Sequence, residues 1–201
     1  PIREARVEVF SQLTGEVFSV AGSDRYGSFR ALVPIGSEYA LRALSQSSES
    51  GLAVGDNTRG GALYFVSASI EVETAPVLVA FDADRTSGAF NILEVIRQGN
   101  TLLRETRSDL PLPSMGIYWS PNNIAVAGDA EQGQIGGTFF NADTSTAYIL
   151  GDRTTDSDEF DDSVILHEYA HLLASRFSRD DSRGGPHVLG DVLDPRVAWS
   201  E

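Results

Sequence analysis

The chain has 201 residues, of which 41% are hydrophobic, so it is long enough to bury a core as one large domain or two small ones. Its 15 Lys and Arg residues stand against 29 Asp and Glu residues, and the resulting net charge of −14 argues against a nucleic-acid partner. It contains no cysteine, so disulfides are excluded and any metal ligands must come from His, Asp and Glu.

No stretch approaches the roughly 18 to 20 apolar residues that a transmembrane helix needs, so we expect no membrane span. The chain begins at Pro1 without a basic-then-apolar signal segment. A first residue other than Met indicates a processed or trimmed product, and processing would have removed any signal peptide.

Residues 2–79 carry the pattern of short strands joined by tight turns. Alternating hydrophobic runs are interrupted by Gly, Ser, Asp and Pro, which is typical of half-buried strands. We therefore predict a small antiparallel β-sandwich as a first domain over residues 1–80, with a long polar loop over residues 45–61. The predicted strands are Arg6–Phe10, Glu16–Val20, Ser28–Val33, Tyr39–Leu44, Leu63–Ser67 and Ser69–Glu73.

After Asp82 the hydrophobic spacing changes to that of helices, which predicts a second, mixed α+β domain over residues 81–201. A first helix is predicted over Ser87–Arg107, either continuous or interrupted at Gly99. A second is predicted over Ser163–Phe177, with aspartates before it as N-caps. Strands are predicted at Gly116–Trp119, Gly137–Phe140 and Thr146–Leu150, the last two joined by a turn at Asn141–Ser145.

Two histidines stand four residues apart in the second predicted helix, within SVILHEYAHLLASRF. Residues at this spacing project from one face of a helix, so His167 and His171 are placed to share one cation. Neutral imidazole suits Zn²⁺, and a catalytic zinc site keeps one position for a water whose pKa it lowers towards about 7. In this HExxH motif Glu168 is the general base that takes the proton of the water and returns it to the leaving amine.

A chance occurrence of HExxH on an amphipathic helix is the alternative, with half-buried histidines and a solvated Glu168. The flanks weigh against it, because they bury the helix on nearly all sides and polar groups inside it then need partners. A metal ion supplies one. The apolar flanking residues are Val164, Ile165, Leu166, Ala170, Leu172 and Leu173.

A catalytic zinc site needs a third protein ligand. The sequence downstream of the motif offers three carboxylates and the remaining histidine as candidates. These candidates are His187, Asp191, Asp194 and Glu201.

The segment DEFDDSVILHEYAHLLASRFSRDDSRGGPHVLGDVLDPRVAWSE resembles bacterial gluzincin-type metallopeptidases, with similarity over about residues 85–201. The metzincin class is disfavoured because Ala174 and Phe177 stand where that class has Gly and His. The resemblance implies a zincin-like core, made of a helix, a small twisted sheet, the HExxH helix and a Glu-bearing helix. It also implies a secreted, cell-surface or periplasmic protein that hydrolyses a peptide or protein substrate.

The resemblance carries over onto particular residues. His167 and His171 become the imidazole ligands and Glu168 the base. Glu201 becomes the third zinc ligand, on a helix that Asp194 would cap. An extended substrate would bind along an edge strand formed by Tyr148, Ile149 and Leu150.

The chain stops at Glu201, where the resemblance leads us to expect the helix to continue. We therefore expect a zincin-like domain that is truncated at its C-terminal end, with further domains possible beyond residue 201 and reduced activity of this fragment. Upstream, TGEVFSVAGSDRYGSFRALVPIGSEYALRAL resembles the carboxypeptidase regulatory-like, transthyretin-type sandwich, which implies an accessory spacer or docking domain.

Other residues keep several interpretations. His187 could stabilise an oxyanion, bind the metal or cap a loop. The acidic residues over 152–162 could bind Ca²⁺, although their spacing does not match an EF-hand and helix capping is the simpler account. Zinc-bound histidines usually donate to a carboxylate or carbonyl, and the candidates for that role are Asp161, Asp162, Asp191 and Asp194.

A surface binding or adhesion module is the rival function. In that case the sandwich recognises a partner and the metal site is structural or dormant.

Overall fold

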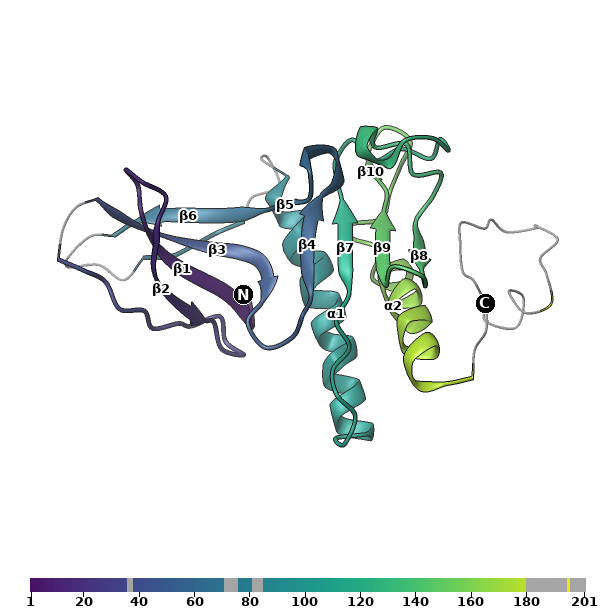
Figure 1. Ribbon diagram of the computed structural model, residues 1–201, viewed down its shortest axis with the longest axis horizontal. Helices are drawn as coiled ribbons and strands as arrows, with labels where there is room; N and C mark the ends of the chain where they lie inside the picture. Colours follow the sequence, from purple (N-terminus) through teal and green to yellow (C-terminus); the bar gives the residue numbers. More distant parts are fainter. Residues whose placement is uncertain (36–37, 71–75, 81–84, 180–194, 196–201) are drawn as a thin grey trace.

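The computed structural model describes residues 1–35, 38–70, 76–80, 85–179 and 195. This part of the chain has a mixed α+β architecture, as predicted, with one large sheet and two α-helices (Figure 1). The sheet has nine strands, and a separate pair, β10 (Gly151–Asp152) and β11 (Asp156–Ser157), lies before the second helix. No helix in these described residues is long and apolar enough to cross a membrane.

The large sheet combines an antiparallel part with a parallel part. β4, β7 and β9 run parallel to one another, and all the other pairings are antiparallel. Figure 1 shows the antiparallel strands β1, β3 and β6 running across the view and the parallel strands β4, β7 and β9 running up it. The order is β2 (Val17–Gly22), β1 (Ala5–Ser11), β3 (Tyr39–Ser47), β4 (Ala53–Asp56), β7 (Gly116–Trp119), β9 (Thr146–Ile149) and β8 (Phe139–Asn141), with β5 (Ala62–Leu63) on β4 and β6 (Phe65–Ser69) on β3.

The predicted N-terminal sandwich is not what the described residues form. Ser28–Val33 is not a strand, and its Phe29 and Ala31 instead pack on the hydrophobic face of β1, β3 and β6. Phe90 of the first helix covers the same face, so no second sheet is required there. The strands before residue 80 join those after it in one sheet, and the division into two domains stays a prediction.

The long polar loop predicted over residues 45–61 is also wrong. It contains the end of β3, the whole of β4 and a short 3₁₀ helix, η1 (Asn57–Arg59). Leu52 and Val54 are 1% and 0% exposed, so this segment contributes to the core. Its few apolar residues stand among Ser and Gly, and such a run is too short to show a period.

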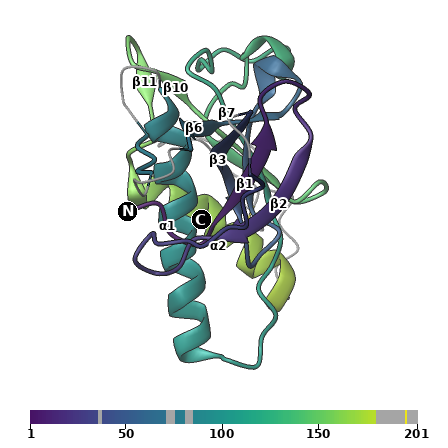
Figure 2. The ribbon, with the colours of Figure 1, turned by 90° about the vertical axis from the view of Figure 1, so that its left-hand side faces the viewer.

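The two helices match their predicted positions closely: α1 spans Thr86–Thr106 without interruption, and α2 spans Asp162–Phe177. Both pack on the face of β4, β7 and β9 that carries Val54, Ile117 and Ile149, and the side view in Figure 2 shows them alongside the sheet. α1 contributes Ala89, Ile92, Leu93, Val95 and Ile96 to this core, and α2 contributes Ile165, Tyr169 and Leu172.

Candidate metal centre

The two histidines of the HExxH motif converge. Their Nε2 atoms lie 3.1 Å apart, and their ring planes are inclined at 83°. Two imidazole nitrogens at 2.0 to 2.1 Å from one tetrahedral zinc ion would lie about 3.3 Å apart. His167 and His171 therefore fit a shared zinc ion in both donor chemistry and spacing.

Glu168 is only 3% exposed, and His171 is 7% exposed, whereas His167 is half-buried. A carboxylate is rarely this buried unless it is paired or binds a cation. The motif is thus set into the protein rather than lying on a solvated helix face, contrary to what a chance HExxH string predicts.

The described residues contain no group of three or more His, Asp or Glu side chains placed to hold a metal. The expected third ligand, Glu201, lies outside them, as do His187, Asp191 and Asp194. Of the predicted site, the structure describes His167, His171 and, adjacent to His167 in the same helix, Glu168.

The start of α2 is fixed by Asp161, which is its N-cap. The Asp161 carboxylate accepts from the backbone N–H groups of Ser163 and Val164 at 3.1 and 3.2 Å, as an N-cap aspartate should. The Ser163 hydroxyl also donates to this carboxylate, at 2.7 Å. The hydroxyl bond first, and then the backbone bonds, lower the pKa of Asp161. The prediction that aspartates cap this helix is confirmed.

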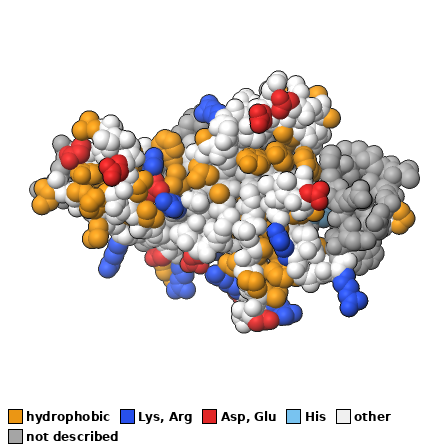
Figure 3. Space-filling view, viewed as in Figure 1, with side chains coloured by type: hydrophobic (Ala, Val, Ile, Leu, Met, Phe, Trp, Pro, Cys, Tyr) orange, Lys and Arg blue, Asp and Glu red, His pale blue; other side chains and the backbone are white. Residues whose placement is uncertain are grey.

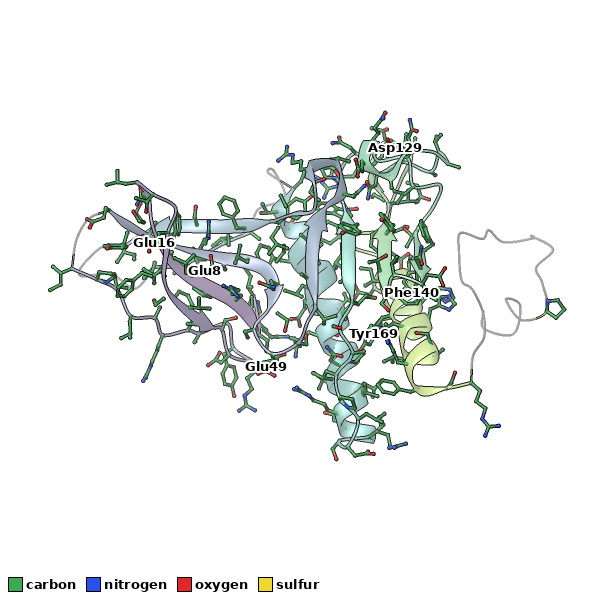
Figure 4. The ribbon with its side chains drawn as sticks, in the orientation of Figure 1. Glu8, Glu16, Glu49, Asp129, Phe140 and Tyr169 are labelled. Atoms are coloured by element: carbon green, nitrogen blue, oxygen red, sulfur yellow. The ribbon has the colours of Figure 1, made fainter. Side chains whose placement is uncertain are left out.

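The middle and the end of α2 are held by other elements. Tyr169, which is 2% exposed, donates its hydroxyl to Oδ1 of Asn100 in α1, and Figure 4 shows Tyr169 between the two helices. Burial raises the pKa of Tyr169 to about 12, so the hydroxyl stays a donor at neutral pH. At the other end, Arg176 donates to Ser145 Oγ in the turn between β8 and β9 at 2.7 Å.

A buried ion-pair cluster lies just before α2. Glu159 is fully buried, and its Oε1 accepts from Arg85 at 3.0 Å and from Arg153 at 3.1 Å. Arg85 also donates to the carbonyl of Gly151 at 2.7 Å. Because Arg85 is the N-cap residue of α1 and Glu159 lies three residues before the first residue of α2, the cluster connects the starts of the two helices.

The other acidic side chains over 152–162 mostly accept hydrogen bonds from neighbouring residues. Asp152 accepts from the N–H and hydroxyl of Thr154, and these bonds lower its pKa. Burial raises the pKa of Asp158, which accepts from the Thr138 hydroxyl. This pattern favours turn formation and capping over a calcium site.

The predicted edge position of Tyr148, Ile149 and Leu150 is wrong. Tyr148 and Ile149 lie in β9, which is paired on both sides, with β7 in parallel and β8 in antiparallel register. Leu150 follows β9, and its N–H donates to the Thr138 hydroxyl at 2.9 Å. β8 is the last strand of the order, and it contacts α2. The hydrophobic pattern could not show which of β8 and β9 lies at the edge, since both strands are short.

Sequence reasoning also missed the residues that hold α2. Asn100 follows Ile96 by four residues, which places an amide on the buried face of α1, and this spacing was a usable signal. The Arg85–Glu159 pair joins residues 74 apart in the chain, and no local pattern indicates it.

Comparisons with models of protein families, with curated proteins and with solved structures found no match for this chain.

Proposed function

We propose that this chain binds one zinc ion through His167 and His171 and uses it to hydrolyse peptide bonds. The observation that carries the proposal is the 3.1 Å separation of the two Nε2 atoms beside a buried Glu168. Glu201 is the third ligand in this proposal, and His187 is a residue that stabilises negative charge on the substrate carbonyl oxygen. The roles of Glu201 and His187 are inferred from the sequence alone, because both residues lie outside the described part of the chain.

Zinc in such a site polarises a carbonyl and makes a water molecule acidic enough to attack near neutral pH. Glu168 accepts the proton of the attacking water and passes it to the leaving amine, so that the amine departs neutral. Because Glu168 is adjacent to His167 on one helix, base and ligand keep a fixed relation to each other. Its burial limits the bulk water that would otherwise compete for its hydrogen bonds.

The substrate in this proposal is an extended peptide that pairs with β8 (Phe139–Asn141). In the described sheet β8 has a strand on only one side, so its outer backbone groups can add a strand. α2 contacts this strand, which would bring a paired peptide close to the helix that carries the motif.

The test is zinc content by elemental analysis, followed by peptide hydrolysis. We expect about one zinc per chain, lost in His167→Ala and His171→Ala. Glu168→Gln should keep its zinc and lose about 10²- to 10⁴-fold in kcat/KM, the usual contribution of a general base. Glu105→Gln changes an exposed carboxylate of α1 in the same way and should alter neither. A reconstituted wild type without zinc would contradict the proposal.

A binding or adhesion module is the second candidate, and exposed hydrophobic side chains favour it. Hydrophobic side chains are visible over the antiparallel part of the sheet, at the left-hand end of the molecule in Figure 3. If the protein holds zinc and neither wild type nor Glu168→Gln hydrolyses peptides, the metal would be structural and this candidate would replace the enzyme. Exposed hydrophobic residues on or beside the antiparallel strands include Phe18, Val20, Leu32 and Phe65.

A further inference from the structure

α1 and α2 meet through a polar pair inside an otherwise apolar contact. Asn100 is 6% exposed and Tyr169 is 2% exposed, and the Tyr169 hydroxyl donates to Asn100 Oδ1. The surrounding residues form the main hydrophobic cluster, with Ile96 and Leu172 among them. A buried hydrogen bond in such surroundings is costly to leave unmade, since each group then loses its partner without regaining water.

The pair restricts how α2 can lie on α1. Hydrophobic contacts tolerate small slides and rotations, but a hydrogen bond weakens steeply when its length or angle departs from the optimum. A slide of α2 by one residue moves its side chains by about 1.5 Å along the axis, enough to break the bond. Gly99 adds a second restriction, because the Tyr169 ring occupies the space where a Cβ at position 99 would lie.

Tyr169 is two residues from each of the motif histidines, His167 and His171. Two residues on an α-helix correspond to a rotation of about 200°, so the tyrosine and the imidazoles point to opposite sides of α2. The tyrosine therefore acts on the histidines through the rigid helix, and a rotation or slide of α2 displaces both imidazoles together.

We infer that Asn100 is a positioning residue for the zinc site: through Tyr169 it sets the register of α2, and with it the direction in which His167, Glu168 and His171 are presented. The inference rests on the proposed zinc function. It adds a residue on a different helix, 67 positions before His167, to those that determine the affinity and geometry of the site.

The test compares Tyr169→Phe, Asn100→Leu and the double variant with wild type. Three quantities are measured: zinc affinity by competition with a chelator, the absorption bands of the Co²⁺-substituted protein, and Tm. Each single variant leaves one buried polar group unpaired and should lower Tm, weaken zinc binding about tenfold and shift the Co²⁺ bands. The double variant removes both polar groups, so Tm should recover largely. Zinc affinity and the Co²⁺ bands should not recover, because the directional contact is still missing.

Tyr64→Phe is the matched control. Tyr64 is a half-buried tyrosine whose hydroxyl donates to the Trp119 carbonyl at 3.0 Å, and Trp119 belongs to β7 rather than to α2. It should lower Tm without changing zinc affinity or the Co²⁺ bands.

Unchanged affinity and bands in both single variants would overturn the inference, as would a double variant that regains wild-type zinc affinity together with Tm, since that marks a purely structural pair. A wild type that binds no zinc is a different failure. It would overturn the proposed function, and the inference with it.

Discussion

Gly99 of α1 lies directly against Tyr169 of α2. A Cβ at position 99 would come within 2.9 Å of Tyr169 Cε1 and within 3.3 Å of Leu166 Cδ2. Glycine normally weakens a helix interior, yet α1 runs through this position without a break. The missing side chain is therefore what allows the helix that carries the HExxH motif to approach α1 so closely.

Gly99→Ala should destabilise the protein, although helix propensity alone favours alanine by about 0.8 to 1 kcal/mol. The added methyl group must displace the Tyr169 ring, and overpacking of this kind costs typically about 1 to 3 kcal/mol, so we expect a net loss of up to about 2 kcal/mol. Urea unfolding measures it. Gln98→Ala, at the exposed neighbouring position, should leave stability nearly unchanged. A more stable Gly99→Ala protein would show that the contact is loose.

Arg85→Ala should cost about 2 to 3 kcal/mol, near the lower end of the range for breaking a buried ion pair, because Arg153 still pairs with Glu159. The stability falls because the fully buried carboxylate of Glu159 loses the guanidinium of Arg85 and keeps that of Arg153. Adding Glu159→Gln to Arg85→Ala should recover part of the loss, since the uncompensated charge is then gone.

Arg107→Ala is the control for Arg85→Ala. Arg107 pairs with Asp109 on the surface, and both side chains are more than half exposed, so its removal should give no measurable change in urea unfolding. Equal losses in the two variants would mean that burial of Glu159 does not determine the strength of its ion pairs.

The contrast between α1 or α2 and the sheet shows how far the sequence could predict this fold. α1 has a long, strongly periodic hydrophobic pattern, and α2 combines a long apolar stretch with Asp161 as an N-cap, so local information defined both helices. The strands are short, and their partners are set by contacts distant in the chain. β4 pairs with β7 across 63 positions at Ala53 and Gly116, and no local pattern specifies that pairing.

The candidate site divides in the same way. His167, Glu168 and His171 form a local motif on one helix, and their spacing alone predicted the convergence of the two imidazoles. The groups that hold the helix, among them Asn100 and Arg85, come from α1 and its start. Their role depends on how two helices dock, which periodicity does not encode.

Asp158→Asn should make the protein more stable at neutral pH. Burial raises the pKa of Asp158 in the folded state, so the charged form is penalised once the pH exceeds that pKa. The asparagine is neutral and can still accept from the Thr138 hydroxyl. The gain in Tm should therefore be present at pH 7 and disappear as the pH falls below the unfolded pKa of about 3.9. Asp143→Asn, at an exposed position, should show no such gain, and a gain that persists at pH 3 would contradict the explanation.

Asp161→Ala should have the opposite effect. The hydrogen bonds that Asp161 accepts at the start of α2 lower its pKa, so its ionised form stabilises the folded state above the unfolded pKa, and this contribution is lost as the pH falls through the folded pKa. Loss of the cap should cost about 1 kcal/mol at pH 7 and less in acid. Asp161→Asn, which retains a capping oxygen, should recover most of the loss in urea unfolding at pH 7. If it does not, capping geometry is not the main contribution of this residue.

Glu201→Gln should weaken zinc binding more than Asp191→Asn or Asp194→Asn does. A neutral amide is a poorer zinc ligand than a carboxylate, and in the proposed site the loss of one of three protein ligands should lower affinity at least about 10- to 100-fold, since even outer-sphere changes have effects of that size. Asp191→Asn and Asp194→Asn are the matched changes, and chelator competition on all three variants ranks them. His187→Ala should leave zinc affinity near wild type if that residue acts on the substrate. A large loss in His187→Ala with none in Glu201→Gln would transfer the third ligand position to the histidine and contradict the gluzincin assignment.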